Sequence, residues 1–199
     1  MRMAGVTATV VLLVALVAGA WVYGGDGGDP SAPRSDTVFG DPRLPKAPEP
    51  PKALVQPIGT PSVEISGSPA EVTNAKVLGD ADLGVIAPAV KTISALVSRD
   101  GELVRGTWLF ALRKGQEPGA LMDDITALYT KVGYQSVPTH PDVVALKFAP
   151  SQGPVTYRAH YVSSRGVVRV EAFGPDNRAA AKAFEELLSA QLRTLPSAS

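Results

Sequence analysis

The sequence predicts an α+β fold, an antiparallel sheet of about five strands with helices packed mainly on one face. Three observations lead to this class. Turn residues join pairs of apolar segments, two further segments repeat apolar residues at helical spacing, and the order is strand, strand, helix, three strands, helix. The domain covers residues 62–199 and follows an apolar segment at residues 1–23 and a Gly/Pro-rich segment at residues 24–61.

Residues 4–23 contain no charged side chain, and their length suits a transmembrane helix. About 20 residues at roughly 1.5 Å each span about 30 Å, which is the thickness of the hydrocarbon core of a bilayer. Arg2 precedes the segment, and Asp26 and Asp29 follow it, which favours a cytoplasmic N-terminus and an exported C-terminal domain. We therefore expect an uncleaved signal anchor in a single-pass membrane protein.

Two other interpretations of this segment stay open. Ala18 and Ala20 occupy the two positions that a signal peptidase requires, so cleavage after Ala20 would give a secreted domain. Small residues would also permit close packing against another membrane helix, which would make the protein a small subunit of a membrane complex. These small residues are Gly5, Ala8, Ala15, Ala18 and Gly19.

The segment at residues 24–61 is rich in glycine and proline and shows no periodic apolar face. Prolines recur from Pro30 to Pro61, and proline favours extended polyproline II backbone without regular hydrogen bonds. At about 3.1 Å per residue the segment reaches on the order of 100 Å. We expect a disordered linker that lets the domain stand away from the membrane, although residues 46–52 also fit a polyproline ligand.

The first elements of the domain follow from a capping box and a turn. Ser68 and Glu71, with a proline between them, predict a short helix that runs to about Leu78. Asp100 and Gly101 predict a two-residue hairpin turn, which pairs Val97 with Val104, Ala95 with Gly106 and Ile93 with Trp108. The second strand of this hairpin is apolar on both sides, so we place it centrally in the sheet.

A helix is predicted next, ended by Gly133, because five apolar residues recur at the spacing of one helical face. They are Leu121, Ile125, Leu128, Tyr129 and Val132. A half-buried strand follows, in which Val144, Leu146 and Phe148 alternate with Ala145 and Lys147.

The last hairpin, from Val155 to Phe173, has the clearest pattern. With Ser164 and Arg165 at the turn, one face pairs Tyr157 with Ala172, Ala159 with Val170 and Tyr161 with Val168, and the other pairs Arg158 with Glu171 and His160 with Arg169. Pro175 and Asp176 then begin a final helix. Its apolar stripe is Ala180, Phe184, Leu187, Leu188 and Leu195.

The composition excludes several kinds of chemistry. The chain has 19 Lys plus Arg and 19 Asp plus Glu, and this neutral balance argues against nucleic-acid binding. Without cysteine it has no disulfides, thiolate nucleophiles or Cys-ligated metal centres, and we expect no cofactor and no metal site. Asp80, Asp82 and Gly84 imitate the start of a calcium loop, but Lys91 stands where its bidentate carboxylate belongs, so we interpret them as a turn.

No catalytic motif is visible, and we expect a protein that is not an enzyme. His140 and Asp142 are the candidates for a hydrolase site with an unidentified nucleophile, but no Gly-x-Ser-x-Gly elbow accompanies them. His140 lies between Thr139 and Pro141, and a histidine in a loop is the simpler interpretation.

The polar face of the last hairpin is the candidate contact site. Arg158, His160, Arg169 and Glu171 would form a basic, pH-sensitive strip for a partner if no helix covers them. Lys147 would extend the strip if it lies on the same face of the sheet. An ordinary solvent-exposed sheet face is the simpler interpretation.

The predicted open sheet with helices resembles the PsbP-like domains at the level of the fold. The bias toward Ala, Val, Gly, Pro and Arg is similar to that of uncharacterised membrane-anchored or secreted actinobacterial proteins. Neither resemblance implies a catalytic residue. The order of anchor, spacer and compact domain favours a membrane-tethered extracytoplasmic binding or accessory domain that contacts a protein or another cell-envelope component. The alternative is an exported hydrolase that acts on cell-envelope material.

Overall fold

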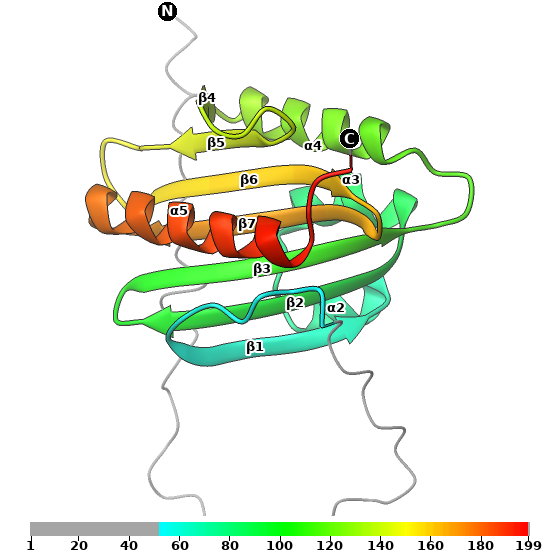
Figure 1. Cartoon of the computed structure of the whole chain (residues 1–199), viewed down its shortest axis with the longest axis horizontal. Coiled ribbons are helices and arrows are strands. Elements are labelled where there is room, and N and C mark those ends of the chain that lie inside the picture. The colour runs from blue at the N-terminus through cyan, green and yellow to red at the C-terminus, as the bar shows by residue number, and fades with distance from the viewer. Residues whose placement is uncertain (1–51, 199) are drawn as a thin grey trace, which may run out of the picture. The chain divides into compact units, whose positions relative to one another are not determined.

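Seven strands form one open antiparallel sheet in the computed structural model, which describes residues 52–198 (Figure 1). The order across the sheet is β1-β2-β3-β7-β6-β5-β4. The α+β class with an antiparallel sheet is confirmed, with seven strands instead of about five. The strands are β1 (Thr60–Gly67), β2 (Val90–Asp100), β3 (Leu103–Leu112), β4 (Gln135–Val137), β5 (Val144–Phe148), β6 (Val155–Ser163) and β7 (Gly166–Gly174).

The two strands that the sequence analysis missed lie at the two edges of the sheet. β1 pairs with β2 and has a bulge between Pro61 and Val63. Pro61 falls in the predicted linker, but proline is tolerated on an edge strand because no further strand needs its missing N–H group. β4 at the other edge has three residues, which are too few for a periodic signal.

The two long hairpins form the centre of the sheet, because β3 pairs with β7. The predicted register of β6 and β7 is confirmed, including Arg158 opposite Glu171. In the hairpin of β2 and β3 the turn lies one residue later than predicted, so Ala95 faces Trp108 instead of Gly106. The φ angle of Gly101 is 59°, a left-handed conformation that favours glycine in the turn.

Four helices lie within the described residues: α2 (Pro69–Asn74), α3 (Asp80–Ala89), α4 (Pro118–Lys131) and α5 (Asn177–Thr194). α2 has the predicted capping box but ends before Leu78. α4 and α5 bury residues of their predicted apolar stripes. α3 replaces the predicted turn, because Asp80 and Asp82 are favourable in the first turn of a helix.

Helices cover both faces of the sheet, which corrects the expectation that they lie mainly on one face (Figure 1). α5 packs against Tyr161 and Val168, whereas side chains of α3 and α4 reach Arg169 and His160. Successive residues of a strand point to opposite faces of the sheet. The sheet therefore separates α5 from α3 and α4.

Residues 53–57, which fall in the predicted linker, pack on the α5 face of the sheet. Gln191 of α5 is fully buried, and its side chain forms two backbone hydrogen bonds of 2.8 Å with this segment. Oε1 accepts from the N–H of Val55, and Nε2 donates to the carbonyl of Ala53. Leu54 lies in the hydrophobic core. The folded unit therefore begins before residue 62.

The predicted transmembrane segment at residues 4–23 lies outside the described residues, as does most of the predicted linker. Within residues 52–198, no helix has the length and apolar character needed to cross a membrane.

Candidate functional site

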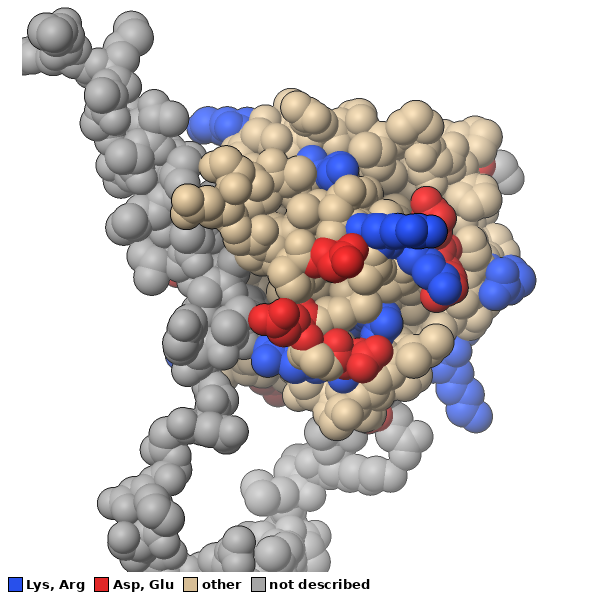
Figure 2. Space-filling model, turned by 90° about the vertical axis from the view of Figure 1, so that its left-hand side faces the viewer, with Lys and Arg blue, Asp and Glu red and all other residues tan. Residues whose placement is uncertain are grey.

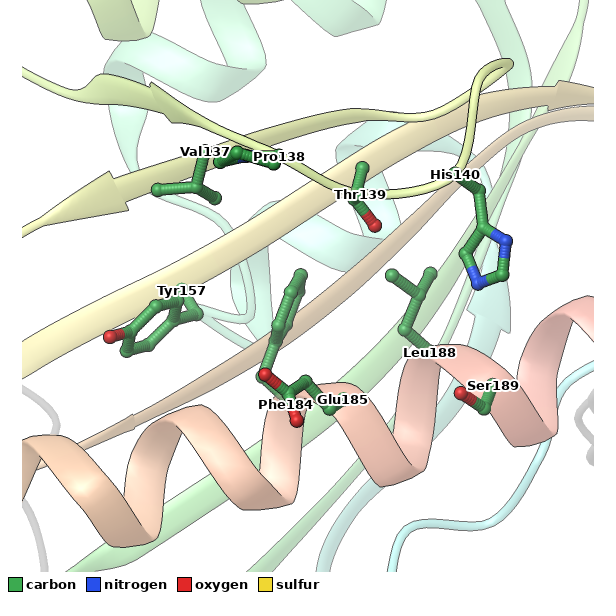
Figure 3. A pocket seen from close by; sticks show the side chains of 9 residues that line it. All are labelled: Val137, Pro138, Thr139, His140, Tyr157, Phe184, Glu185, Leu188 and Ser189. Carbon is green, nitrogen blue, oxygen red and sulfur yellow. The ribbon is translucent and has the colours of Figure 1, made fainter.

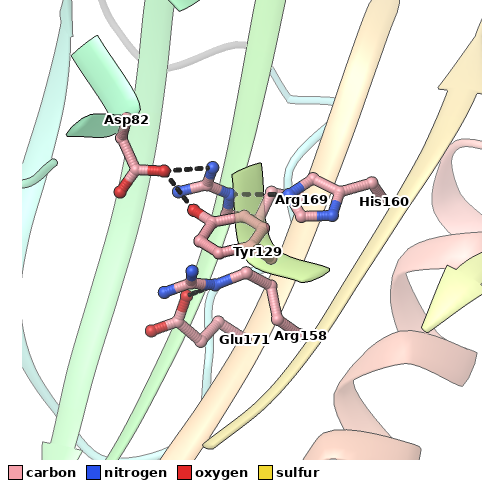
Figure 4. A network of polar contacts seen from close by, with 6 residues as sticks. All are labelled: Asp82, Tyr129, Arg158, His160, Arg169 and Glu171. Atoms are coloured by element: carbon pink, nitrogen blue, oxygen red, sulfur yellow. Dashed lines mark hydrogen bonds and ion pairs between the residues drawn. The ribbon is translucent and has the colours of Figure 1, made fainter. Parts of the chain in front are cut away.

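The four polar residues predicted for the contact strip lie inside the protein (Figure 4). The exposed fraction of His160 is 0%, that of Arg169 is 1% and that of Glu171 is 7%. The side chain of Arg158 is 12% exposed. Residues of α3 and α4 cover this face. The predicted contact strip required a sheet face that no helix covers, and this requirement is not met.

Lys147 lies on the opposite face of the sheet. Its Nζ is 5.2 Å from the centre of the Tyr157 ring, and that ring stacks on Phe184 of α5. Lys147 therefore does not extend the strip. The reason is the alternation of side chains along β5, which directs Lys147 away from the face that Arg158 occupies.

Arg169 on β7 connects the sheet to both helices on the buried polar face (Figure 4). Its Nε donates a hydrogen bond of 2.9 Å to Nε2 of His160, and its Nη2 donates one of 2.9 Å to Oδ1 of Asp82 on α3. The hydroxyl of Tyr129 on α4 donates to the same carboxylate oxygen. One carboxylate thus joins α3, α4 and β7.

A second ion pair lies beside the first. Arg158 donates from Nε to Oε2 of Glu171 across the neighbouring strands. The guanidinium carbon of Arg158 lies 4.2 Å from the centre of the Tyr129 ring, and the same ring stacks on His160 with 5.8 Å between ring centres. We call these six residues the polar cluster: Asp82, Tyr129, Arg158, His160, Arg169 and Glu171.

The surroundings fix the charge of each group in the polar cluster. Burial, together with the guanidinium groups of Arg169 and Arg158, holds the pKa of His160 well below its usual range, so the imidazole is neutral. Burial alone would raise the pKa of Asp82, but the two guanidinium groups outweigh it and lower that pKa. Each of the two guanidinium groups therefore has a carboxylate beside it, Glu171 for Arg158 and Asp82 for Arg169.

The hydrogen bond from Arg169 also fixes the tautomer of His160. Because Nε2 accepts this bond, the proton of the neutral ring lies on Nδ1. Nδ1 is buried and has no hydrogen-bond partner among the described residues. His160 therefore acts in the polar cluster as an acceptor from Arg169.

Asp82 and Tyr129 are the members of the polar cluster that the sequence analysis missed. The sequence pattern places Asp82 in a turn and Tyr129 in an apolar stripe. One signal was available: Arg158 and Glu171 are cross-strand neighbours of opposite charge in a largely apolar hairpin, which is typical of a buried pair. Within residues 52–198, no group of acidic or histidine side chains has an arrangement suited to a metal ion.

A small pocket lies on the other side of the sheet, between α5 and residues 137–140 (Figure 3). Its volume is about 150 Å³. Tyr157 and Phe184 line it with stacked rings 5.7 Å apart, and the hydroxyl of Tyr157 donates a hydrogen bond of 2.8 Å to Asn177, which restrains the ring. The remaining lining residues are Val137, Pro138, Thr139, His140, Glu185, Leu188 and Ser189, and we call the whole the α5 pocket.

The volume of the α5 pocket limits what it can hold. Pockets for small-molecule ligands usually measure about 300–1,000 Å³, and this pocket has a volume of about 150 Å³. A single apolar side chain of a partner fits such a volume better than a whole substrate. Glu185 and Ser189 add polar groups beside the aromatic rings.

The residues considered for a hydrolase are only partly brought together. His140 lines the α5 pocket with Ser189, but within residues 52–198 no hydrogen bond joins these two side chains. Asp142 accepts a hydrogen bond of 3.4 Å from Ser197 instead of orienting His140. A nucleophile, a base and an orienting carboxylate are therefore not connected as a triad requires.

The surface at the N-terminal end of α5 carries charges of both signs. Figure 2 shows acidic and basic side chains interspersed on this face, which also contains the turn between β2 and β3. A surface of mixed sign gives little attraction to a polyanion such as a nucleic acid.

Comparisons of the sequence with protein-family models and with curated proteins found no match.

Proposed function

We propose that the protein is a membrane-tethered extracytoplasmic binding or accessory domain, without catalytic activity, that contacts a protein or another component of the cell envelope through the α5 pocket. The observation that carries this proposal is the composition of the pocket, in which two stacked aromatic rings lie next to polar groups. Aromatic rings with a polar rim are typical of protein contact sites. The polar cluster, in contrast, is paired internally and lies beneath helices.

The chemistry of the pocket defines the partner's contacting group. An apolar side chain would pack against the half-buried ring of Tyr157, which stacks on the buried ring of Phe184, and it would displace water from the Tyr157 ring. The carboxylate of Glu185 would accept a hydrogen bond from an adjacent donor of the partner, and Ser189 can donate or accept. The partner is therefore a protein or peptide segment with an apolar residue next to a polar or basic group.

Photo-crosslinking from the pocket tests this contact. A photoreactive side chain at Glu185 should give an adduct with the partner in cells that produce the protein. The matched control places the same group at Asp124, which is exposed on α4 at the opposite face of the sheet. A second substitution, Ser189→Trp, fills the pocket and should abolish the adduct at Glu185. Adducts that are equal from both positions, or that persist after Ser189→Trp, would contradict the proposal.

The tether is a separate part of the proposal. Residues 4–23 would cross the membrane with the N-terminus in the cytoplasm, and the domain would lie outside. The intact mass of the protein, measured separately in membranes and in medium, tests this. A full-length mass confined to membranes is expected. A mass that lacks the residues through Ala20, found in the medium, would instead show a secreted domain.

An exported hydrolase acting on cell-envelope material is the second candidate. The observation that favours it is that His140 and Ser189 line one pocket (Figure 3). In some enzymes the hydrogen bonds of the catalytic site form only after substrate binds, and His140 and Ser189 would form theirs in this way. The measurement is turnover on a panel of envelope substrates by the native protein and by His140→Ala. Turnover that His140→Ala abolishes would favour the enzyme, and no turnover by the native protein would disfavour it.

A further inference from the structure

The polar cluster attaches two helices to the sheet through a bond that depends on the protonation of one imidazole. Asp82 of α3 and Tyr129 of α4 both bind around Arg169, and Arg169 is itself positioned by its 2.9 Å bond to His160. α5, in contrast, packs on the opposite face mainly through apolar residues. The two helical layers therefore differ in how they can respond to acid.

We propose that His160 makes the attachment of α3 and α4 sensitive to acid: protonation of its imidazole breaks the bond from Arg169 and loosens both helices from the sheet while α5 stays packed. This inference concerns the opposite face of the sheet from the α5 pocket and does not depend on the proposed function. It describes a conformational change of a folded protein, not global unfolding.

Protonation replaces an attraction with a repulsion. The neutral ring accepts a hydrogen bond at Nε2, whereas an imidazolium carries N–H groups at both nitrogens, so two donors would then face each other across 2.9 Å. The added charge also places three cations beside two carboxylates in a buried space. Arg169 would have to move. Because Arg169 and Tyr129 both donate to Asp82, this movement would disturb the bonds that hold α3 and α4 to the sheet.

The groups that face His160 come from every element packed around it. α3 supplies Asp82, and α4 supplies Tyr129, whose ring stacks on the imidazole. Tyr134, which follows α4, contacts the Tyr129 ring at 5.0 Å. The strands supply Arg158, Arg169 and Glu171. Neither carboxylate forms a hydrogen bond with His160, and each is already paired with a guanidinium group.

In one pH range, a His160 ring that becomes exposed on opening is protonated while the carboxylates stay ionised. A histidine that becomes exposed has a pKa of about 6.5, and exposed carboxyl groups titrate near pH 4. The pKa of Asp82 is held below that of an exposed aspartate, so Asp82 stays ionised above about pH 4.5. Between about pH 4.5 and pH 6.5, an increase in opening therefore reports histidine protonation. For one proton, opening increases by at most about tenfold per pH unit.

Hydrogen exchange of the full-length chain in detergent micelles is the test, with rates corrected for the intrinsic effect of pH. The expected result is that exchange in α3 and α4 rises by up to about tenfold per pH unit below pH 6.5, while exchange in α5 stays constant. An equal rise in all three helices would overturn the proposal, because it would show global unfolding. Constant exchange in α3 and α4 down to about pH 4.5 would overturn it as well.

The chain offers a matched control because it contains two histidines. In His160→Gln, the side-chain carbonyl can still accept from Arg169 but cannot be protonated, so the acid response of α3 and α4 should disappear. In His140→Gln, the exposed histidine is removed, and the response should stay as in the native chain. A response that persists in His160→Gln, or that is lost in His140→Gln, would overturn the proposal.

If His160→Gln does not fold, the native chain still gives an answer. With labelled histidine, nuclear magnetic resonance distinguishes the two imidazole rings and follows each titration. The ring of His160 in the folded chain should still be neutral at the pH at which the exchange of α3 and α4 begins to rise, because protonation takes place in the opened form. A His160 ring that becomes protonated in the folded chain while the exchange of α3 and α4 stays constant would refute the proposed trigger.

Discussion

The guanidinium of Arg169 and the carboxylate of Asp82 lie 2.9 Å apart, although 87 positions separate them in the sequence. Their side chains are 1% and 14% exposed. This pair fastens the helix α3 to the central strand β7 beneath the surface. A buried ion pair of this kind is sensitive to the loss of either partner, because the remaining charge stays in a medium of low polarity.

Removal of the Asp82 carboxylate should strongly destabilise the fold. Asp82→Ala leaves Arg169 without its carboxylate partner and Tyr129 without its acceptor, and we expect a loss of about 3–5 kcal/mol of unfolding free energy. The measurement is urea unfolding of the full chain. Asp80→Ala is the control, since Asp80 is exposed in the same helical turn and should cost less than about 1 kcal/mol. Similar losses for the two variants would contradict the role assigned to Asp82.

Two glycines should respond to alanine in opposite directions. At Gly166 the φ angle is 132°, and an added Cβ would collide with the carbonyl oxygen of Phe110 on β3. Gly166→Ala should therefore cost more than about 3 kcal/mol, because backbone atoms must shift. Gly84 lies inside α3, and nothing lies within 4 Å of an added Cβ, so Gly84→Ala should stabilise by about 0.5–1 kcal/mol. Thermal unfolding of both variants measures the difference, and a loss of stability in Gly84→Ala would argue against the helix α3.

Tyr161 should make stability decrease at alkaline pH. Its buried hydroxyl donates a hydrogen bond of 2.8 Å to the carbonyl of Leu195, and burial raises its pKa to about 12 from the usual 10. Since the pKa is higher in the folded chain, the contribution of Tyr161 is complete below pH 10 and is lost as the pH rises from 10 to about 12. The free energy of unfolding, measured across this range with tyrosinate absorbance, should fall less steeply in Tyr161→Phe. Equal slopes would contradict the assignment.

The last hairpin shows what the sequence could predict. Both of its faces are consistent at one register. Tyr161 lies opposite the apolar Val168, and Arg158 lies opposite Glu171, which has the opposite charge. A shift by one residue would exchange the two faces, and so the register is strongly determined. The final helix was predictable for a similar reason, since its apolar stripe repeats with the period of the helix.

The covering of the polar face was not predictable from the same pattern. Polar residues on one face of a strand usually indicate solvent, and only the pairing of Arg169 with Asp82, far away in the sequence, allows them to be buried. α3 itself was hidden by Gly84 and Pro88, which are unfavourable inside helices. The α5 pocket combines Tyr157 with Ser189 from separate elements, so no local motif marks it.

The most direct measurement of the central claim uses the absence of cysteine from the chain. The variants Glu185→Cys at the α5 pocket and Asp124→Cys on the opposite face each carry one thiol, and both positions are exposed. A maleimide that does not cross membranes is added to intact cells and to the purified proteins. We predict equal rates on the purified proteins, whereas on cells Asp124→Cys should react rapidly and Glu185→Cys slowly, because the partner shields the pocket. Rapid reaction of both on cells would contradict binding at the pocket, and reaction of neither would contradict an extracytoplasmic domain.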